Sequence, residues 1–173
     1  RSFFLHVSLS PWVTGMRQRI EQLYGNRLRL RVVGLCWRDD RLLMVNHRGL
    51  HAADFWAPPG GGVAFGVSAE EALRQEFREE TGLEIQVDRF QFACEFIQGP
   101  LHSMELFFMC SETGGTLARG YDPEMEADEQ LIADVRYMSG DEIGALKDDE
   151  KHGIFRALGN PGELRKARGF FKI

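Results

Sequence analysis

Three glutamates, Glu76, Glu79 and Glu80, have a spacing that would gather their carboxylates on one side of a short helix. At about 100° per residue they fall on one narrow arc, and apolar residues lie in or beside that arc. Like charges three and four residues apart repel each other, and partial burial makes each charge more costly. A bound cation removes both costs, and carboxylate oxygens are the ligands that hard cations such as Mg²⁺ prefer. The arc therefore predicts a metal site, and a solvated acidic helix is the alternative.

The helix that would carry these glutamates has clear start and stop signals. Ser68 is a good N-cap residue, and Glu71 three residues later completes the pattern of a capping box. Gly82 suits the left-handed conformation in which many helices end. Before the helix, the glycines at 60–62 would allow backbone amides and carbonyls to come close to a metal or a phosphate. We therefore expect a glycine-rich loop that leads into a carboxylate-bearing helix.

Residues 61–83 resemble the box motif of the Nudix (MutT-like) hydrolase family, G-x5-E-x7-R-E-U-x-E-E-x-G-U, in which U is an apolar residue. The matching positions are two glycines, three acids and two apolar residues: Gly61, Glu76, Phe77, Glu79, Glu80, Gly82 and Leu83. Two positions depart from the motif, because Val67 replaces its first Glu and Gln75 replaces its Arg. The flanking sequence extends the resemblance over roughly residues 28–145.

The resemblance implies an α/β fold, the Nudix α/β/α sandwich around a mixed β-sheet. It also implies hydrolysis of a diphosphate bond in a nucleoside diphosphate that is linked to another group, with a metal-activated water as the nucleophile. Glu76, Glu79 and Glu80 would be metal ligands together with the Gly61 carbonyl, and the expected ion is Mg²⁺, with Mn²⁺ as the alternative. The catalytic residues would be Glu76, Glu80 and Glu129, with Glu76 the first candidate for the general base and Glu129 the second.

Two other functions stay open at this point. The first is a Nudix-fold module that binds a nucleotide as a sensor and turns it over weakly, an option supported only by Val67 and Gln75. The second is an acidic interaction domain that has no site. The substrate would be a small nucleotide-type molecule, but specificity lies in loops whose side chains follow no code, so its binding residues stay unassigned.

The composition narrows the possible partners. A net charge of −5 argues against a general nucleic-acid binder, which would be basic. The apolar run at 3–9 is too short to span a membrane, so no membrane partner is expected. The three cysteines stand in apolar runs without CxxC spacing, which indicates buried free thiols in a reducing compartment, the cytoplasm. These cysteines are Cys36, Cys94 and Cys110.

The chain of 173 residues suits one domain with a sizeable core. Residues 1–26 are predicted to form an N-terminal extension, a short apolar run followed by a helix over 14–24, for packing or for a homodimer. Residues 27–173 would form the Nudix domain. Its apolar patterning predicts strands at 28–37, 42–46, 84–96, 104–110 and 131–138, a helix over 141–151, and a solvated helix face in the tail from 156.

Glu105 and the histidines are polar residues outside the motif. Glu105 alternates out of phase with its apolar neighbours, so we expect it to face a cleft or water. His51 and His102 could reach a substrate from a loop or a turn. The remaining histidines have no metal-ligand spacing and are expected to be structural or exposed: His6, His47 and His152.

Overall fold

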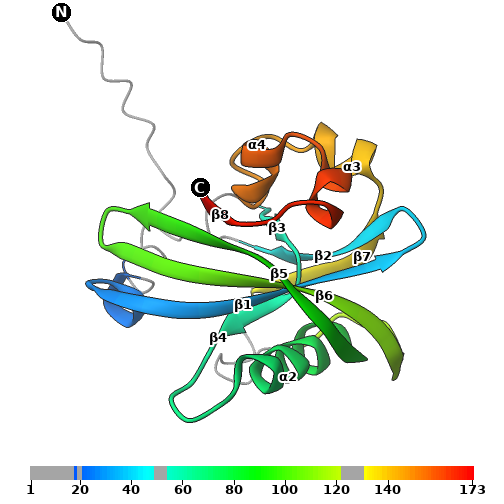
Figure 1. Cartoon of the computed structure of the whole chain (residues 1–173), viewed down its shortest axis with the longest axis horizontal. Helices are drawn as coiled ribbons and strands as arrows, with labels where there is room; N and C mark the ends of the chain where they lie inside the picture. Colours follow the sequence, from blue (N-terminus) through cyan, green and yellow to red (C-terminus); the bar gives the residue numbers. More distant parts are fainter. Residues whose placement is uncertain (1–17, 19–20, 49–53, 122–130) are drawn as a thin grey trace, which may run out of the picture.

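The structure, a computed structural model, describes residue 18 and residues 21–48, 54–121 and 131–173. Figure 1 shows a twisted β-sheet with helix α2 on one face and the C-terminal elements on the other. The sheet contains both parallel and antiparallel pairs, because β1 runs parallel to β6 and antiparallel to β2. The predicted α/β/α sandwich around a mixed sheet is therefore confirmed.

Three long strands, two of seven residues and three short ones build the sheet within the described part of the chain. Their bounds are β1 Arg27–Arg38, β2 Arg41–His47, β3 Trp56–Ala57, β4 Gly60–Gly62, β5 Leu83–Gln98, β6 Leu101–Gly115, β7 Ile132–Met138 and β8 Phe170–Lys172. The hydrogen-bonded order is β3-β2-β1-β6-β5-β8, with β4 paired to β1 and β7 paired to β2. The strands at 28–37, 42–46, 84–96 and 131–138 were predicted to within two residues, whereas β6 extends five residues beyond the predicted end at 110.

Helix α2 (Ala69–Thr81) is the predicted acidic helix. The Ser68 hydroxyl accepts a hydrogen bond from the Glu71 amide at 3.2 Å, which caps its first turn. Gly82 closes the helix with φ of 71° and donates its amide to the Arg78 carbonyl. Both ends of the helix are therefore set by the residues that the sequence indicated.

The late helix is shorter than predicted. Helix α3 (Gly140–Ala145) begins after Ser139, which forms a full capping box with Glu142, but the helix ends well before residue 151. The reason is tertiary, since the Trp56 amide donates to the Glu150 carbonyl and the His152 amide donates to the Trp56 carbonyl. Residues 150–152 are thus extended against β3, and they cannot also be helical.

The prediction of a solvated helix face for the tail was wrong. The tail folds into α4 (Ile154–Leu158), a 3₁₀ turn η1 (Pro161–Arg165) and β8. The buried Gln91 side-chain amide donates to the carbonyls of Leu164, Arg165 and Ala167 at 3.0, 2.8 and 3.1 Å. These bonds and the buried apolar side chains Ile154, Phe155 and Leu164 fix the tail on the sheet.

Two apolar clusters fill the sandwich, one on each face of the sheet. The α2-face cluster includes Val32, Leu73, Phe77, Leu83 and Phe108. The opposite cluster, under the C-terminal elements, includes Leu35, Phe92, Phe107, Ile143 and Ile154. All three cysteines are buried and free, as predicted.

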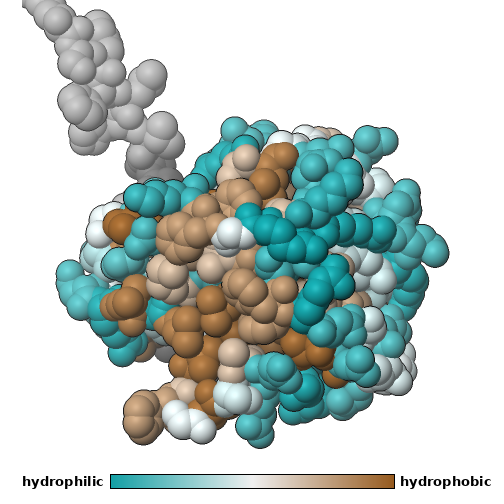
Figure 2. Space-filling view, viewed as in Figure 1, coloured by the Kyte–Doolittle hydropathy of each residue, from teal (hydrophilic) through white to brown (hydrophobic). Residues whose placement is uncertain are grey.

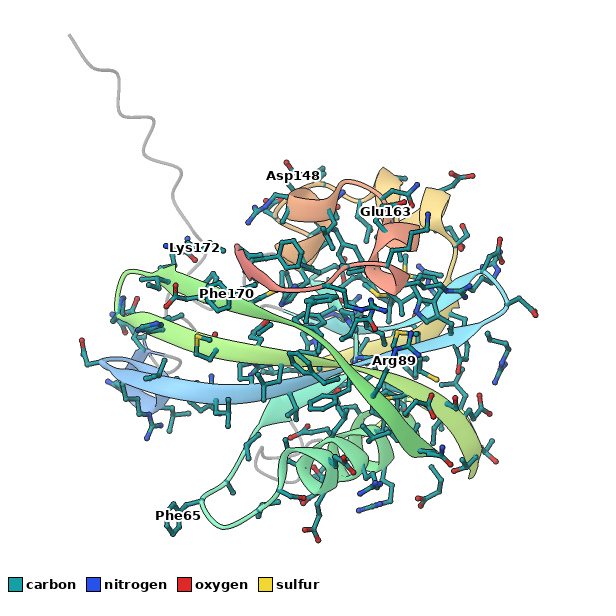
Figure 3. All side chains as sticks on the ribbon, in the orientation of Figure 1. Phe65, Arg89, Asp148, Glu163, Phe170 and Lys172 are labelled. Atoms are coloured by element: carbon teal, nitrogen blue, oxygen red, sulfur yellow. The ribbon has the colours of Figure 1, made fainter. Side chains whose placement is uncertain are left out.

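The edges of the domain carry several exposed apolar side chains. Figure 3 shows Phe65 pointing away from the domain at the tip of the loop between β4 and α2, and this side chain is fully exposed. Phe90 of β5 and Phe170 of β8 are also exposed, and Figure 2 shows a broad apolar area on the viewed face. Gln18 and residues 21–24 are helical, in agreement with the helix predicted over 14–24. No helix among the described residues is long and apolar enough to cross a membrane.

Candidate metal and catalytic site

Glu80 is a buried carboxylate that joins three elements. Its side chain leaves α2, Oε2 accepts a hydrogen bond from the Gly60 amide of β4 at 2.9 Å, and Oε1 lies 3.1 Å from Nε2 of His47 at the end of β2. The residue is only 7% exposed. No lysine or arginine of the described chain lies within ion-pair distance of it. A buried carboxylate without a fixed counter-charge is costly, so this position suits a bound cation.

Glu76 lies directly on the glycine run. A Cβ atom at Gly61 would come within 2.0 Å of Glu76 Oε1, a distance that real side chains never reach. Only glycine therefore allows the Glu76 carboxylate to rest against the backbone of β4. The structure thus brings together Gly61 and Glu76, which are 15 positions apart in the sequence.

Glu79 is held by the residue that departs from the motif. The Gln75 side-chain amide donates to Glu79 Oε1 at 2.8 Å, one turn earlier on α2. Val67, the other departure, is half-buried and packs against the α2-face cluster. A neutral amide and an apolar side chain therefore stand where the motif has an Arg and a Glu, and they leave no unpaired charge beside the acids.

The three glutamates do not converge on one point. Within the described residues, no group of three His, Cys, Asp or Glu side chains has the geometry of a formed metal centre. Glu79 instead contacts Gln75, and Glu80 contacts Gly60 and His47. The donor set still fits a hard divalent cation, because it consists of carboxylate oxygens around a glycine backbone, with one carboxylate buried and uncompensated.

A segment after β6, which we call the strap (residues 116–121), covers the C-terminal end of α2. The amides of Ala118, Gly120 and Tyr121 donate to the carbonyls of Thr81, Glu80 and Glu79 at 2.9, 3.0 and 3.1 Å. A Cβ atom at Gly120 would lie 1.9 Å from the Glu79 carbonyl oxygen, so glycine is required for this close approach. The strap therefore satisfies helix carbonyls that would otherwise lack partners.

Four further residues were singled out from the sequence. Glu129 and His51 fall outside the described residues. His102, on β6, lies 3.1 Å from Glu95 of β5, a different carboxylate from the glutamates of α2. Glu105 was expected to face a cleft or water, but it is 6% exposed. The prediction failed because Glu105 points with Phe107 to the face that the C-terminal elements cover.

Buried Glu105 has two partners of its own. Oε1 lies 3.2 Å from Arg31 Nε, and Oε2 lies 2.7 Å from His152 Nε2. Burial by itself would raise the pKa of Glu105, but the interactions with His152 and Arg31 outweigh burial and lower the pKa to about 2. Glu105 is therefore ionised and paired with an arginine. Glu80 has no lysine or arginine partner among the described residues.

Two residues of the site were missed at the sequence level. His47 was expected to be structural or exposed, and Gly60 was assigned no contact of its own. Their roles depend on β2 and β4 meeting at one end of α2, a tertiary arrangement. The only local signal for His47 was its place at the end of a predicted strand.

The comparisons with known proteins agree with this geometry. The NUDIX domain model matches residues 27–158, which is most of the chain. The chain therefore belongs to the Nudix hydrolase family, whose members act on nucleoside diphosphate derivatives. This confirms the family that the motif indicated and the predicted class of enzyme, a hydrolase of diphosphate bonds.

Solved structures share the fold at low sequence identity. A NUDIX hydrolase from Nitrosomonas europaea has 21% identity and a TM-score of 0.60, over 69% of this chain and 77% of that chain. A UDP-X diphosphatase has 20% identity and a TM-score of 0.62, over 92% of this chain and 74% of that chain. An ADP-ribose pyrophosphatase from Streptococcus suis has 18% identity and a TM-score of 0.58, over 82% and 98% of the two chains. A search of the curated proteins finds no match.

Proposed function

We propose that the protein is a Mg²⁺-dependent pyrophosphohydrolase that cleaves a nucleoside diphosphate linked to another group, and that Mn²⁺ can replace Mg²⁺. The observation that carries the proposal is the state of Glu80, a buried carboxylate that contacts an amide and an imidazole but no cationic lysine or arginine of the described chain. Glu76 beside it lies on the bare backbone of Gly61. The motif resemblance and this geometry support the same donor set.

In this proposal Glu76, Glu79, Glu80 and the Gly61 carbonyl hold the metal. The ion would neutralise the diphosphate oxygens and lower the pKa of a bound water. The residues around it have separate tasks. Gly60 and His47 contact the two oxygens of Glu80, and Gln75 orients Glu79, so each of these two carboxylates has defined partners before substrate binds.

Two glutamates are candidates for the general base that takes the proton of the attacking water. Glu76 is the first candidate, and Glu129 is the second. The variants Glu76→Gln and Glu129→Gln separate them on a pH–rate profile. If Glu129 is the base, Glu129→Gln lowers the rate and removes the acidic limb of the profile with little change in metal affinity. If Glu129→Gln behaves like the parent, the base is assigned to Glu76.

A turnover screen tests the proposed function. The panel contains nucleotide sugars, dinucleotides and nucleoside triphosphates, each with Mg²⁺, with Mn²⁺ and with a chelator. Two structural neighbours are a UDP-X diphosphatase and an ADP-ribose pyrophosphatase, so nucleoside diphosphate sugars are the first substrates to try. Metal-dependent release of a nucleoside monophosphate is the expected result, and absence of turnover on the whole panel contradicts the proposal.

The second candidate function is a nucleotide sensor with weak turnover. The observation in its favour is that a neutral amide from Gln75 holds Glu79 where the motif has a charged guanidinium. Tight nucleotide binding by calorimetry, with turnover below one event per minute in the same buffer, would select this candidate.

The proposal also covers the ligand, the location and the oligomeric state of the protein. We expect a small nucleotide as its ligand, no nucleic-acid partner, and a cytoplasmic location in keeping with three free buried thiols. We also propose a homodimer, since β5 and β8 leave apolar side chains such as Phe90 and Phe170 exposed. Sedimentation velocity at two concentrations tests the dimer.

A further inference from the structure

The first half of β1 carries a row of arginines on one face. Arg27, Arg29 and Arg31 alternate with Leu28 and Leu30, so the arginines point to the face away from α2. This row runs past the glycine strand, because Arg31 is the register partner of Gly62 in β4. Cationic side chains therefore lie next to the glycine run on the face of the sheet opposite Glu76.

Arg31 is already neutralised. Its Nε lies 3.2 Å from Glu105 Oε1, and Glu105 Oε2 lies 2.7 Å from His152 Nε2. The Ile154 amide donates to His152 Nδ1 at 3.2 Å, so Nδ1 is an acceptor and the proton sits on Nε2. Glu105 is thus shared by two groups, since it forms an ion pair with Arg31 and accepts a hydrogen bond from His152.

Arg29 is a half-buried cation without a carboxylate. Its guanidinium carbon lies 3.8 Å from the centre of the Tyr24 ring, a cation–π contact that holds the side chain in place. None of the ion pairs among the described residues includes Arg29. Burial, and next the neighbouring Arg31, lower its pKa to about 10. The positive charge at this position is therefore held in place by Tyr24 and has no salt-bridge partner among the described residues.

The guanidinium of Arg29 reaches the glycine run itself. Its Nη2 lies 3.5 Å from the point where a Cβ atom of Gly62 would be, so the absence of a side chain there leaves it uncovered. Gly62 directly follows Gly61, on which Glu76 rests. A group bound by Arg29 would therefore lie close to the metal site that we propose, across the thickness of one strand.

A planar guanidinium binds a phosphate through two parallel hydrogen bonds, and this pairing is strongest where water is partly excluded. We propose that Arg29, held by Tyr24 and supported by the paired Arg31, binds a phosphate group of the substrate on this side of the glycine run. The inference rests on the proposed function for the identity of the ligand as a nucleotide. It names the substrate class as nucleotides with a phosphate beyond the scissile diphosphate, such as nucleoside triphosphates, in preference to nucleotide sugars, in which an uncharged sugar follows the diphosphate.

The first experiment measures anion binding without catalysis. Inorganic tripolyphosphate is titrated into the full chain by calorimetry, in the presence of a chelator, for the parent, Arg29→Met, Arg29→Lys and Arg27→Met. Arg29→Met is expected to weaken binding about tenfold to hundredfold, the size of a lost charge-assisted contact. Arg29→Lys keeps the charge but not the fork, so part of the affinity returns.

Arg27→Met is the matched control, because Arg27 is on the same face and strand but is exposed and further from Gly62. It should keep the affinity of the parent within about twofold, as expected for an exposed charge. Equal affinities for the parent and Arg29→Met overturn the inference, and so does a parent that binds no tripolyphosphate. Unchanged melting temperatures in the variants show that the measured differences are not losses of fold.

The second experiment tests the substrate class. The ratio kcat/KM is measured with Mg²⁺ for a nucleoside triphosphate and for the diphosphate sugar of the same nucleoside, in the parent and in Arg29→Met. A loss of about tenfold or more on the triphosphate alone supports the inference, and an equal loss on both substrates overturns it. A parent that hydrolyses neither substrate, yet binds tripolyphosphate through Arg29, overturns the proposed function and keeps the phosphate subsite.

Discussion

Glu80 and Glu105 are two buried glutamates with similar surroundings and different charge balance. Each contacts the Nε2 atom of a histidine, at 3.1 Å for His47 and 2.7 Å for His152. Glu105 also pairs with Arg31, whereas the second partner of Glu80 is the Gly60 amide. One permanent positive charge thus separates a closed structural cluster from a carboxylate that can still accept a cation. Burial alone therefore does not distinguish the two acids, and the lack of a lysine or arginine partner among the described residues is the observation on which we base the proposed metal-binding role of Glu80.

The largest expected effect is on turnover, and it comes from substitution of Glu80, the glutamate without a lysine or arginine partner among the described residues. Glu80→Gln should lower turnover by about 10²–10⁴-fold, because it removes the negative charge that holds the metal. The amide oxygen can still accept from Gly60, so the melting temperature should stay within a few degrees of the parent. The measurement is kcat with Mg²⁺ beside a thermal unfolding curve. An unchanged rate contradicts the metal-ligand assignment.

Substitution of Glu105, the glutamate paired with Arg31, should instead lower the stability of the protein. Glu105→Gln leaves Arg31 without a counter-charge in a half-buried position and should reduce the free energy of unfolding by roughly 3 kcal/mol at neutral pH. Urea unfolding measures this loss. Glu95→Gln is the matched control, because Glu95 pairs with His102 in a more exposed position and should cost no more than about 0.5 kcal/mol. Equal losses in the two variants would show that Arg31 adds nothing to the cluster.

Acidic pH should remove the stability that the cluster of Glu105, Arg31 and His152 contributes. The pKa of Glu105 is lowered from 4.5 to about 2 by His152 and Arg31, against the effect of burial. A lowered folded-state pKa contributes stability that is complete above the ordinary value of 4.5 and is lost as the pH falls toward 2. The parent should therefore lose more stability than Glu105→Gln between these two pH values. Parallel urea midpoints for the two proteins across this range contradict the assignment.

Substitution of His47 should have a smaller effect, a weaker affinity of the proposed site for metal. His47→Leu removes the partner of Glu80 Oε1 and should weaken Mn²⁺ binding about tenfold, in the range found for groups that orient metal ligands. His47→Gln can still donate a hydrogen bond and should recover most of the affinity. Electron paramagnetic resonance of free Mn²⁺ reports the dissociation constant without turnover. The same affinity in His47→Leu and the parent would remove His47 from the site.

The two departures from the motif should have the smallest effect. Gln75→Arg together with Val67→Glu would restore a charged pair, and we expect turnover to rise severalfold above the product of the two single effects. Gln75→Arg alone should lower turnover, because an unpaired guanidinium would compete for Glu79. The measurement is a double-mutant cycle on kcat. Strictly additive changes would show that the two positions do not act as a pair.

The sequence predicted the features that depend on local patterns. The box helix was placed correctly because its cap, its closing glycine and its acids lie within one short segment. Most strand positions followed from apolar alternation in the same way. The motif likewise selected Gly61 and Glu76, whose contact the structure shows.

The features that the sequence did not reveal depend on distant pairing. Nothing near Glu105 indicates that Arg31 and His152, 74 and 47 positions away, will surround it. The short α3 has a similar cause, because residues 150–152 pair with Trp56 instead of continuing the helix. His47 and Gly60 meet Glu80 only after β2, β4 and α2 have packed together.

The strap over α2 has a consequence for the dynamics of the proposed site. The amides of Ala118, Gly120 and Tyr121 can exchange with deuterium only when they leave the carbonyls at the end of α2. Their exchange rates should therefore match one another and those of the last helical turn. An opening of the strap would remove the partners of the Glu79 and Glu80 carbonyls, so equal exchange rates would show that the strap and the last turn of α2, which carries two of the proposed metal ligands, open as one unit.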